Sequence, residues 1–261
     1  MTISTHPRHL TIITGASRGM GLAMAEQRLR PGHTVLTLAR GGEPPSLTAQ
    51  ADARGAQLVH WQADLANAAP ISARVHEWLG QFSDDHFASV TLINNAGVIP
   101  AIVPLRDAET TDLARALRVG LEAPMLLTAA FLDATRRWHG ARRVLNISSG
   151  LGRRPMASQS AYCAAKAGMD LFSRCVALDE ASQDNGARVC SLAPGVIDTD
   201  MQVQLRGADA AAFPDRENFE QLKSRGALSS PQEAARRVLD WLDRPDFGDN
   251  PVADVRDAAR G

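Results

Sequence analysis

Short runs of apolar residues alternate along this chain with longer stretches in which apolar residues recur every three or four positions. The short runs predict buried strands, and the longer stretches predict helices with one apolar face. Strands are expected at residues 10–13, 34–38, 58–61, 90–94, 143–147, 188–192 and 252–255. Helices are expected at about 21–30, 46–54, 68–82, 107–138, 158–184 and 231–243.

This alternation of strand and helix indicates an α/β fold. Such a chain forms a doubly wound parallel sheet, here of about seven strands, with right-handed crossovers and helices on both faces. With 261 residues, of which 44% are hydrophobic, the chain can bury a substantial core, and α/β folds of this size are commonly a single domain. Because ligands collect at the carboxyl ends of parallel strands, we expect one cleft at that edge.

Residues 202–227 interrupt the alternation. We interpret them as a mobile flap over the substrate, because long segments between regular elements are often functional. The alternative is a surface insertion without a function. Met156, Met201, Phe213 and Phe219 either form an apolar wall for the substrate or are ordinary core residues.

The first expected strand runs directly into the sequence Thr14-Gly-Ala-Ser-Arg-Gly-Met-Gly21, and a helix follows. A strand, a glycine-rich turn and a helix form a phosphate site, because glycines allow a close backbone approach and the helix N-terminus offers unpaired N–H groups. The spacing of Gly15, Gly19 and Gly21 differs from the G-x-G-x-x-G fingerprint, and no P-loop lysine follows. The turn therefore argues against a nucleotide triphosphatase. A glycine turn that serves packing alone is the alternative.

Ser149, Tyr162 and Lys166 form the most informative spacing in the chain. Tyr162 and Lys166 are four positions apart, so they fall on one face of a helix. A phenol beside an ammonium is a proton donor whose ionised form is stabilised, as the reduction of a carbonyl or the oxidation of an alcohol requires. Tyr162 is also the only tyrosine in the sequence. A surface helix with a packed tyrosine is the alternative for the pair alone.

Five motifs occur in the order and spacing of one family. They are Thr14-Gly15-x-x-x-Gly19-x-Gly21, Asn94-Asn95-Ala96-Gly97, Ser149, Tyr162-x-x-x-Lys166 and Pro194-Gly195. Each motif is weak, but together they are highly specific, and over nearly its whole length the chain resembles the short-chain dehydrogenase/reductase family. The stretches 123–128, 194–201, 219–223 and 228–231 resemble its sepiapterin reductase and benzil reductase group. The resemblance implies one NAD(P)-binding Rossmann domain over residues 1–261.

Charge favours NADP(H) as the cofactor. At the end of the second strand of a dinucleotide fold, an acidic residue binds the ribose 2′-hydroxyl, whereas an arginine accommodates a 2′-phosphate. Here that strand ends at Arg40, and Arg18 in the glycine turn can pair with the same phosphate. Each arginine alone is equally consistent with a solvated side chain, but both fall where one phosphate would lie.

The resemblance implies further contacts to the cofactor. It brings Asp64 and Leu65 to the adenine and Asn95 to its ribose, although Asp64 is equally well explained as a cap for the next helix. It also brings three residues after the sixth strand to the nicotinamide. With the turn and the two arginines, the expected cofactor-binding residues are Gly15, Ser17, Arg18, Gly19, Met20, Gly21, Arg40, Asp64, Leu65, Asn95, Tyr162, Lys166, Val196, Ile197 and Thr199.

The expected reaction is the NADPH-dependent, reversible reduction of a ketone, diketone or pterin side-chain ketone to an alcohol. As hydride reaches the carbon, negative charge grows on the oxygen, and a donor within about 3 Å must neutralise it. Tyr162 would supply the proton and Ser149 would hold the same oxygen, while the neighbouring Ser148 is expected to turn away from the cleft. The resemblance implies that Lys166 lowers the pKa of Tyr162 and hydrogen-bonds the nicotinamide ribose.

Two positions leave the activity and the substrate open. The family usually carries an asparagine where this chain has Gly120, and that asparagine is thought to anchor a water in a proton relay through its main-chain carbonyl. Glycine keeps the carbonyl and weakens the helix by about 1 kcal/mol, so we expect the relay to survive with an altered rate. An NADP(H)-binding sensor without turnover is the alternative. Asp254 aligns with the aspartate that anchors the pterin in sepiapterin reductases, or it is a solvated terminal side chain.

Composition excludes several other classes. The formal net charge is −1, which predicts neither nucleic acid nor anionic lipid as a partner. No stretch approaches the roughly 18 apolar residues of a membrane-spanning helix, and residues 1–9 lack the apolar core of a signal peptide, so we expect a cytoplasmic protein. Cys163, Cys175 and Cys190 suggest reduced, mostly buried thiols without a metal. The sequence offers no convincing histidine partner for the serine nucleophile of a serine hydrolase.

The partners expected are a small-molecule carbonyl or alcohol substrate and other copies of this chain. The resemblance implies a homodimer or homotetramer that pairs through the two long helices at about 107–138 and 158–184.

Overall fold

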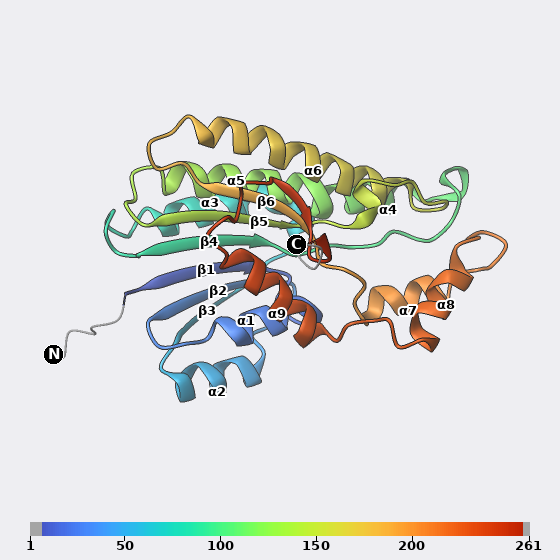
Figure 1. Cartoon of the computed structure of the whole chain (residues 1–261), viewed down its shortest axis with the longest axis horizontal. Coiled ribbons are helices and arrows are strands. Elements are labelled where there is room, and N and C mark those ends of the chain that lie inside the picture. The colour runs from blue at the N-terminus through green and yellow to red at the C-terminus, as the bar shows by residue number, and fades with distance from the viewer. Residues whose placement is uncertain (1–6, 258–261) are drawn as a thin grey trace.

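Seven strands form one parallel sheet in the order β3-β2-β1-β4-β5-β6-β7 (Figure 1). This computed structural model describes residues 7–257. The strands are β1 (His9–Thr14), β2 (His33–Ala39), β3 (Gln57–Gln62), β4 (Ser89–Asn94), β5 (Ala141–Ile147), β6 (Arg188–Ala193) and β7 (Val252–Asp254). Each expected strand overlaps one of these, so the predicted doubly wound parallel sheet is confirmed.

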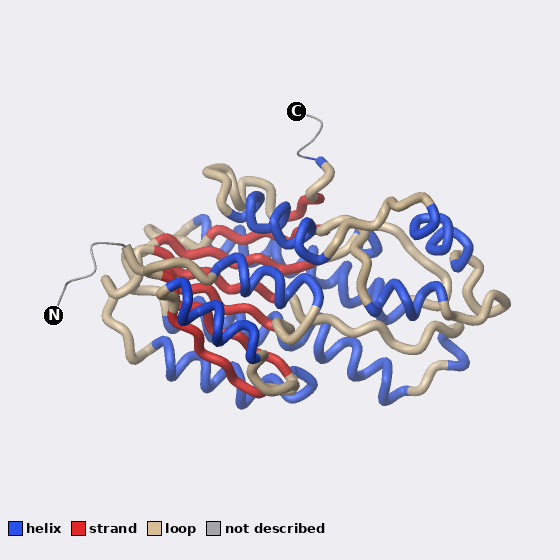
Figure 2. Tube along the Cα trace, turned by 90° about the horizontal axis from the view of Figure 1, so that it is seen from below, coloured by secondary structure: helices blue, strands red, loops and turns tan. Residues whose placement is uncertain are grey.

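Helices cover both faces of the sheet (Figures 1 and 2). One face carries α1 (Gly19–Arg28), α2 (Pro45–Arg54) and α9 (Pro231–Leu242). The other face carries α3 (Ala68–Leu79), α5 (Ala123–Ala134) and α6 (Ser160–Ala181). Short 3-10 turns are η1 (Leu65–Asn67), η2 (Leu105–Asp107) and η4 (Gly150–Gly152). Because the sheet is buried on both faces, its strands are nearly continuous apolar runs rather than alternating ones.

The sheet changes its direction of winding between the central strands β1 and β4. From β1 the chain moves outwards to β2 and β3, and it then returns to β4 and continues outwards to β7. Crossovers that leave on opposite sides open a crevice outside the carboxyl ends of these two strands. The hydroxyl of Thr14 accepts hydrogen bonds from the backbone N–H groups of Asn95 and Ala96, both at 2.9 Å. This contact holds together the two strand ends that flank the crevice.

A buried chain of polar side chains joins the central strands to the helices on one face. Asn94 on β4 donates to Asn146 on β5 (2.8 Å) and to Thr128 on α5 (3.2 Å). Asn146 in turn donates to Ser173 on α6 (2.8 Å). All four side chains are buried, and buried polar groups are costly unless they are paired. These hydrogen-bonded side chains therefore fix the position of α6 on the sheet.

The single helix expected at 107–138 is wrong in its bounds and its regularity. The structure has α4 (Thr110–Leu117), a π-helical turn at Arg118–Glu122 and then α5. Pro124 has no N–H to donate to the carbonyl of Gly120 four residues earlier, so the regular helical bond is missing there. The packing here is also close, because a Cβ at Gly120 would lie 3.2 Å from the Cβ of Ala165 on α6 and would require a small shift of the two elements.

The segment 202–227 contains regular structure that the sequence pattern did not predict. The chain forms α7 (Asp200–Arg206) and α8 (Arg216–Ser224), which extend beyond the carboxyl edge of the sheet (Figure 1). Met156, Leu205, Phe213 and Phe219 form a small separate core, in which Phe213 is fully buried. This core holds the two helices together.

No helix within residues 7–257 combines the length and the apolar character that crossing a membrane requires. Among the cysteines, Cys190 is buried, Cys163 is half-buried and Cys175 is exposed. The expectation of mostly buried thiols is therefore wrong, because Cys175 lies on the outer face of α6.

We expect Phe213→Ala to loosen α7 and α8 selectively. The change removes a fully buried ring from a core of few side chains, and such a cavity costs about 3–5 kcal/mol. Hydrogen exchange measured by mass spectrometry should become faster from α7 to α8 and stay slow in β4 and β5. Val203→Ala, on an exposed position of α7, is the control. If hydrogen exchange from α7 to α8 were unchanged in Phe213→Ala, the small core would not be what holds these two helices together.

Candidate active site

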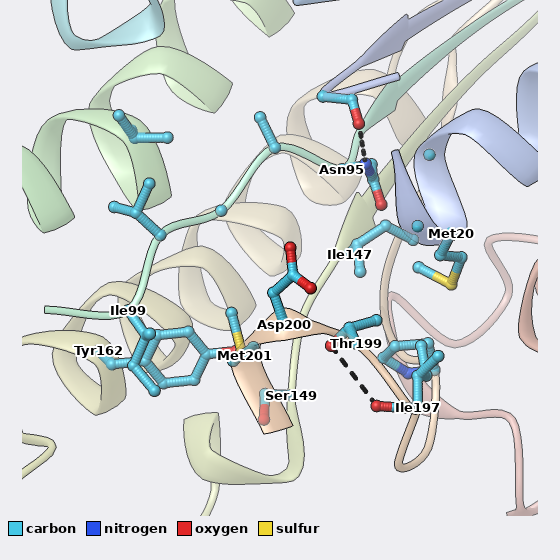
Figure 3. A pocket seen from close by; sticks show the side chains of 18 of the residues that line it. Met20, Asn95, Ile99, Ile147, Ser149, Tyr162, Ile197, Thr199, Asp200 and Met201 are labelled. Atoms are coloured by element: carbon cyan, nitrogen blue, oxygen red, sulfur yellow. Dashed lines mark hydrogen bonds between the residues drawn. The ribbon is translucent and has the colours of Figure 1, made fainter. Parts of the chain in front are cut away.

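A cleft of about 640 Å³ lies at the carboxyl ends of the strands. Every residue predicted to bind the cofactor lines it, as do the three predicted catalytic residues. Figure 3 shows Met20 and Asn95 at one end of the cleft, and Ser149 and Tyr162 at the other. The crevice between β1 and β4 thus brings together residues that are far apart in the sequence. Asp254 alone among the predicted site residues does not line the cleft.

The glycine turn has the backbone geometry that a phosphate site requires. Gly15 and Gly19 have φ angles of 70° and 57°, in the left-handed region that glycine adopts without strain. A Cβ on Gly21 would overlap the Gly15 carbonyl oxygen and the Asn95 side-chain amide. That amide donates to the carbonyl oxygens of Thr14 (2.9 Å) and Gly15 (3.3 Å), as Figure 3 shows in part. Asn95 therefore holds the turn in place, a role that its motif alone did not reveal.

Cationic side chains lie at the glycine-turn end of the cleft. Arg40 follows β2 and is exposed, and Gln62 donates to its backbone carbonyl at 3.0 Å. Arg18 forms an ion pair with Asp200 on α7 at 2.7 Å, with both side chains exposed. Asp64 accepts a hydrogen bond from the backbone N–H of Ala66 at 3.0 Å and so caps η1. Asp64 lines the cleft as well, so the cap interpretation is confirmed and the contact with adenine stays a prediction.

Ser149, Tyr162 and Lys166 meet at the other end of the cleft. Ser149 follows β5, and its hydroxyl accepts a hydrogen bond from the backbone N–H of Leu151 at 3.2 Å. Tyr162 and Lys166 lie in the first two turns of α6, and both are buried. The Lys166 ammonium is 5.7 Å from the centre of the Tyr162 ring and donates to the carbonyl of Ile147 at 2.7 Å.

Burial controls the proton affinity of both groups. It raises the pKa of Tyr162 to about 12, although the hydrogen bond with Ser149 acts in the opposite direction. Burial also lowers the pKa of Lys166 to about 8, although the charge of Asp170 acts to raise it. The expected lowering of the Tyr162 pKa by Lys166 is therefore not what this structure shows. The desolvation of the phenol outweighs the neighbouring groups.

The Asp254 carboxylate is fully engaged by one neighbour. It is buried and accepts hydrogen bonds from the backbone N–H, Nε and Nη2 of Arg256 at 3.0, 2.8 and 2.5 Å. Burial acts to raise the pKa of Asp254, but these hydrogen bonds outweigh it and lower the pKa. Arg256, which sequence reasoning missed, lines the cleft in its place.

The apolar residues near the expected flap divide into two groups. Met201 and Phe219 line the cleft, together with Leu205. Phe213 and Met156 belong to the small core behind it and do not line the cleft. The core interpretation therefore fits Phe213 and Met156, whereas Phe219 belongs to the core and also lines the cleft, as Met201 does from the edge of that core.

Sequence reasoning also missed a buried carboxylate beside the catalytic candidates. Asp170 accepts a hydrogen bond from the hydroxyl of Ser148 at 2.6 Å, so this hydroxyl is engaged behind the cleft although Ser148 itself lines it. The signal was present in the sequence, since Asp170 follows Lys166 by four positions and falls on the same helix face.

Known proteins are similar to this chain over nearly its whole length. A family model described as short chain dehydrogenase matches residues 9–210. The chain is 34% identical over 241 residues to a benzil reductase ((S)-benzoin forming) of Bacillus cereus, covering 92% of this chain and 96% of that protein. It is 33% identical over 247 residues to a sepiapterin reductase of Xenopus tropicalis, covering 90% and 91%. A solved short-chain dehydrogenase/reductase from Burkholderia vietnamiensis is 35% identical, with a TM-score of 0.63 over 96% of this chain and 99% of that one.

We expect Gly21→Ala to abolish dinucleotide binding, because the added methyl would overlap the Gly15 carbonyl and the Asn95 amide. Calorimetric titration with NADPH should show no heat of binding, or at least a hundredfold weaker affinity, which is about 2.7 kcal/mol. Gly42→Ala is the control, because a Cβ there meets nothing within 4 Å. Wild-type affinity in Gly21→Ala would contradict the phosphate role of the turn.

Proposed function

The chain belongs to the short-chain dehydrogenase family, and we propose that it is an NADPH-dependent carbonyl reductase. The substrate is a ketone, a diketone or a pterin side-chain ketone, and the reaction is reversible. The observation that carries the proposal is the meeting of Ser149, Tyr162 and Lys166 in a cleft whose opposite end is a glycine turn at a helix N-terminus.

The turn fits the phosphates of a nicotinamide dinucleotide. No side chain caps the start of α1, so the first N–H groups of the helix remain available to an anion. The position of Gly21 leaves no room for a side chain, so the start of α1 packs closely on Gly15 and Asn95 and keeps the turn compact. When bound, the nicotinamide supplies the hydride.

The residues of this chain supply the proton and the positioning. With a pKa of about 12, Tyr162 keeps its proton at neutral pH and can donate it to the carbonyl oxygen. The Ser149 hydroxyl holds the same oxygen and offsets its growing charge. Lys166 is fixed by the Ile147 carbonyl and presents its ammonium to the ribose that carries the nicotinamide.

The preference for NADPH rests on charge at the adenosine end. Arg40 and Arg18 both line the cleft, and a 2′-phosphate placed between them would make charge-assisted hydrogen bonds. The partner of Arg18, Asp200, is exposed and lies at the start of α7. We infer that the phosphate competes with this carboxylate for Arg18.

Ketones and diketones fit the substrate end better than pterins do. A pterin would need an acceptor for its ring N–H groups, and Asp254 has already accepted three hydrogen bonds from Arg256. Arg256 presents a donor to the cleft instead, which suits a second carbonyl oxygen on the substrate. Met201, Leu205 and Phe219 add apolar surface for an aromatic or aliphatic group.

A sensor that binds NADP(H) without turnover is the second candidate, and Gly120 is the observation that favours it. The loss of the asparagine side chain removes one possible anchor of the proton relay. The carbonyl of Gly120 is retained, and Pro124 cannot engage it in a helical hydrogen bond. We therefore prefer the reductase.

Copies of this chain are proposed to pair through α4, α5 and α6 as a homodimer or homotetramer. These helices carry the exposed apolar side chains Leu117, Met125, Leu171 and Leu178. Their burial in an interface would remove apolar surface from water.

Tyr162→Phe should lower kcat for every reactive carbonyl by about a hundredfold to ten-thousandfold, because it removes the general acid. The measurement is the loss of NADPH absorbance with aryl diketones, pterins and simple ketones. The melting temperature should stay near that of the wild type, which separates lost chemistry from lost folding. Equal rates for Tyr162→Phe and wild type would refute the mechanism. If the wild type binds NADPH but reduces no carbonyl, the sensor is the correct function.

Arg40→Ala should reduce the preference for NADPH over NADH by about 10- to 100-fold in kcat/KM, as expected for one charge-assisted hydrogen bond. The rate with NADH should change little, since only NADPH carries the 2′-phosphate. Arg30→Ala, an exposed arginine in the loop before β2, is the matched control. An unchanged cofactor ratio in Arg40→Ala would show that Arg40 is a solvated surface residue.

A further inference from the structure

Asp170 is a buried carboxylate that the proposed chemistry does not use. It lies on α6 one turn after Lys166. One of its oxygens accepts hydrogen bonds from the hydroxyls of Ser148 (2.6 Å) and Ser191 (2.7 Å). The other accepts from Nε of Arg153 at 3.2 Å. One side chain thus joins α6, the end of β5, the middle of β6 and the loop after η4.

Hydrogen bonds from α6 hold the two residues that precede Ser149 in the sequence. Lys166 donates to the carbonyl of Ile147, and Asp170 accepts from the following residue, Ser148. Helix α6 therefore holds β5 at two successive residues immediately before Ser149. Because Tyr162 is on the same helix, these two contacts set the distance between the Ser149 and Tyr162 hydroxyls.

The turn after Ser149 packs tightly on the same two residues of α6. A Cβ on Gly152 would lie 3.0 Å from a carboxylate oxygen of Asp170 and 3.0 Å from the carbonyl oxygen of Lys166. Arg153 extends the contact, since its Nη2 donates to the carbonyl of Ala253 on β7 at 2.8 Å. The loop at 148–153 is thus clamped between α6 and the sheet edge.

We propose that Asp170 is a positioning residue for carbonyl reduction, which fixes the loop bearing Ser149 against the helix bearing Tyr162 and Lys166. This role rests on the proposed function. Asp170 does not line the cleft. It acts through Ser148, Arg153 and Lys166.

Asp170 also acts on Lys166 through charge. Its carboxylate raises the pKa of Lys166 against the effect of burial, and the result is a pKa of about 8. The other titratable or charged groups facing this region are Tyr162 on α6, Arg153 from the loop and Cys190 on β6, a thiol whose pKa burial raises to about 12. Without the Asp170 charge the Lys166 pKa falls further, so the ammonium loses its proton at a lower pH.

The first test uses the protein without cofactor. Lys166 and Lys223 are the only lysines in the sequence, so NMR of protein labelled with ¹³C-lysine gives one signal from each. In the wild type the Lys166 signal should titrate near pH 8. In Asp170→Asn it should titrate at a lower pH, while Lys223, which pairs with Asp198 on the surface at 2.6 Å, stays unchanged as the internal reference.

The second test follows the reaction. Asp170→Asn should reduce kcat/KM for ketone reduction by about tenfold or more, as expected for lost hydrogen bonds to a charged group. The alkaline limb of its pH profile should move to lower pH. Ser191→Ala removes one hydrogen bond but keeps the charge, so its rate should fall less and its pH profile should not move. That variant keeps the test decisive if Asp170→Asn does not fold.

Glu180→Gln is the matched control, because Glu180 is a carboxylate at the opposite end of α6 that pairs with the buried Arg142 at 3.4 Å. It should lower the melting temperature without moving the Lys166 titration. An Asp170→Asn protein with an unmoved Lys166 signal, or with an equal loss of rate at every pH, would overturn the positioning role. A wild type that reduces no carbonyl would overturn the proposed function and this role with it. An active wild type with an unaltered Asp170→Asn variant would overturn this role alone.

Discussion

The close packing of α6 on the end of β5 is the contact on which the candidate site depends. Small residues make it possible, because Gly120 and Ala165 let α6 lie against the π-helical turn, and Gly152 lets the loop after β5 lie against α6. Lys166 then reaches the carbonyl of Ile147. A larger side chain at any of these points would force these elements to shift relative to one another.

Burial gives the site its chemistry and also carries a cost. Tyr162, Lys166 and Asp170 are enclosed within about two turns of one helix, and removing such groups from water is unfavourable unless they are hydrogen-bonded. Here each has a partner on a neighbouring element. The same desolvation raises the pKa of Tyr162, which keeps its proton, and lowers the pKa of Lys166, which gives up its proton more easily. Stability and reactivity are therefore set by the same contacts.

The two ends of the cleft are built differently. The glycine-turn end is formed by backbone that Asn95 and Thr14 hold rigidly across β1 and β4. The other end, where we propose that the substrate binds, is formed by α7, α8 and the residues after β7, where side chains from short elements meet. Such segments have few contacts with the main core and can differ among proteins of one fold without disturbing it. Substrate choice is therefore the property that membership of the family leaves most open.

The sequence by itself determined the seven strands, the order of strand and helix, and the residues that gather at the carboxyl edge. Those features follow from local periodicity and from motifs whose spacing survives folding. The tertiary structure alone decided the helices around Phe213 and the pairing of Asp254 with Arg256, whereas Pro124 was a local signal for the break in the helix after Gly120. It also revealed Asp170 as the junction of four elements. Pairing between distant side chains depends on which elements pack together, and that information is not present in any local stretch of sequence.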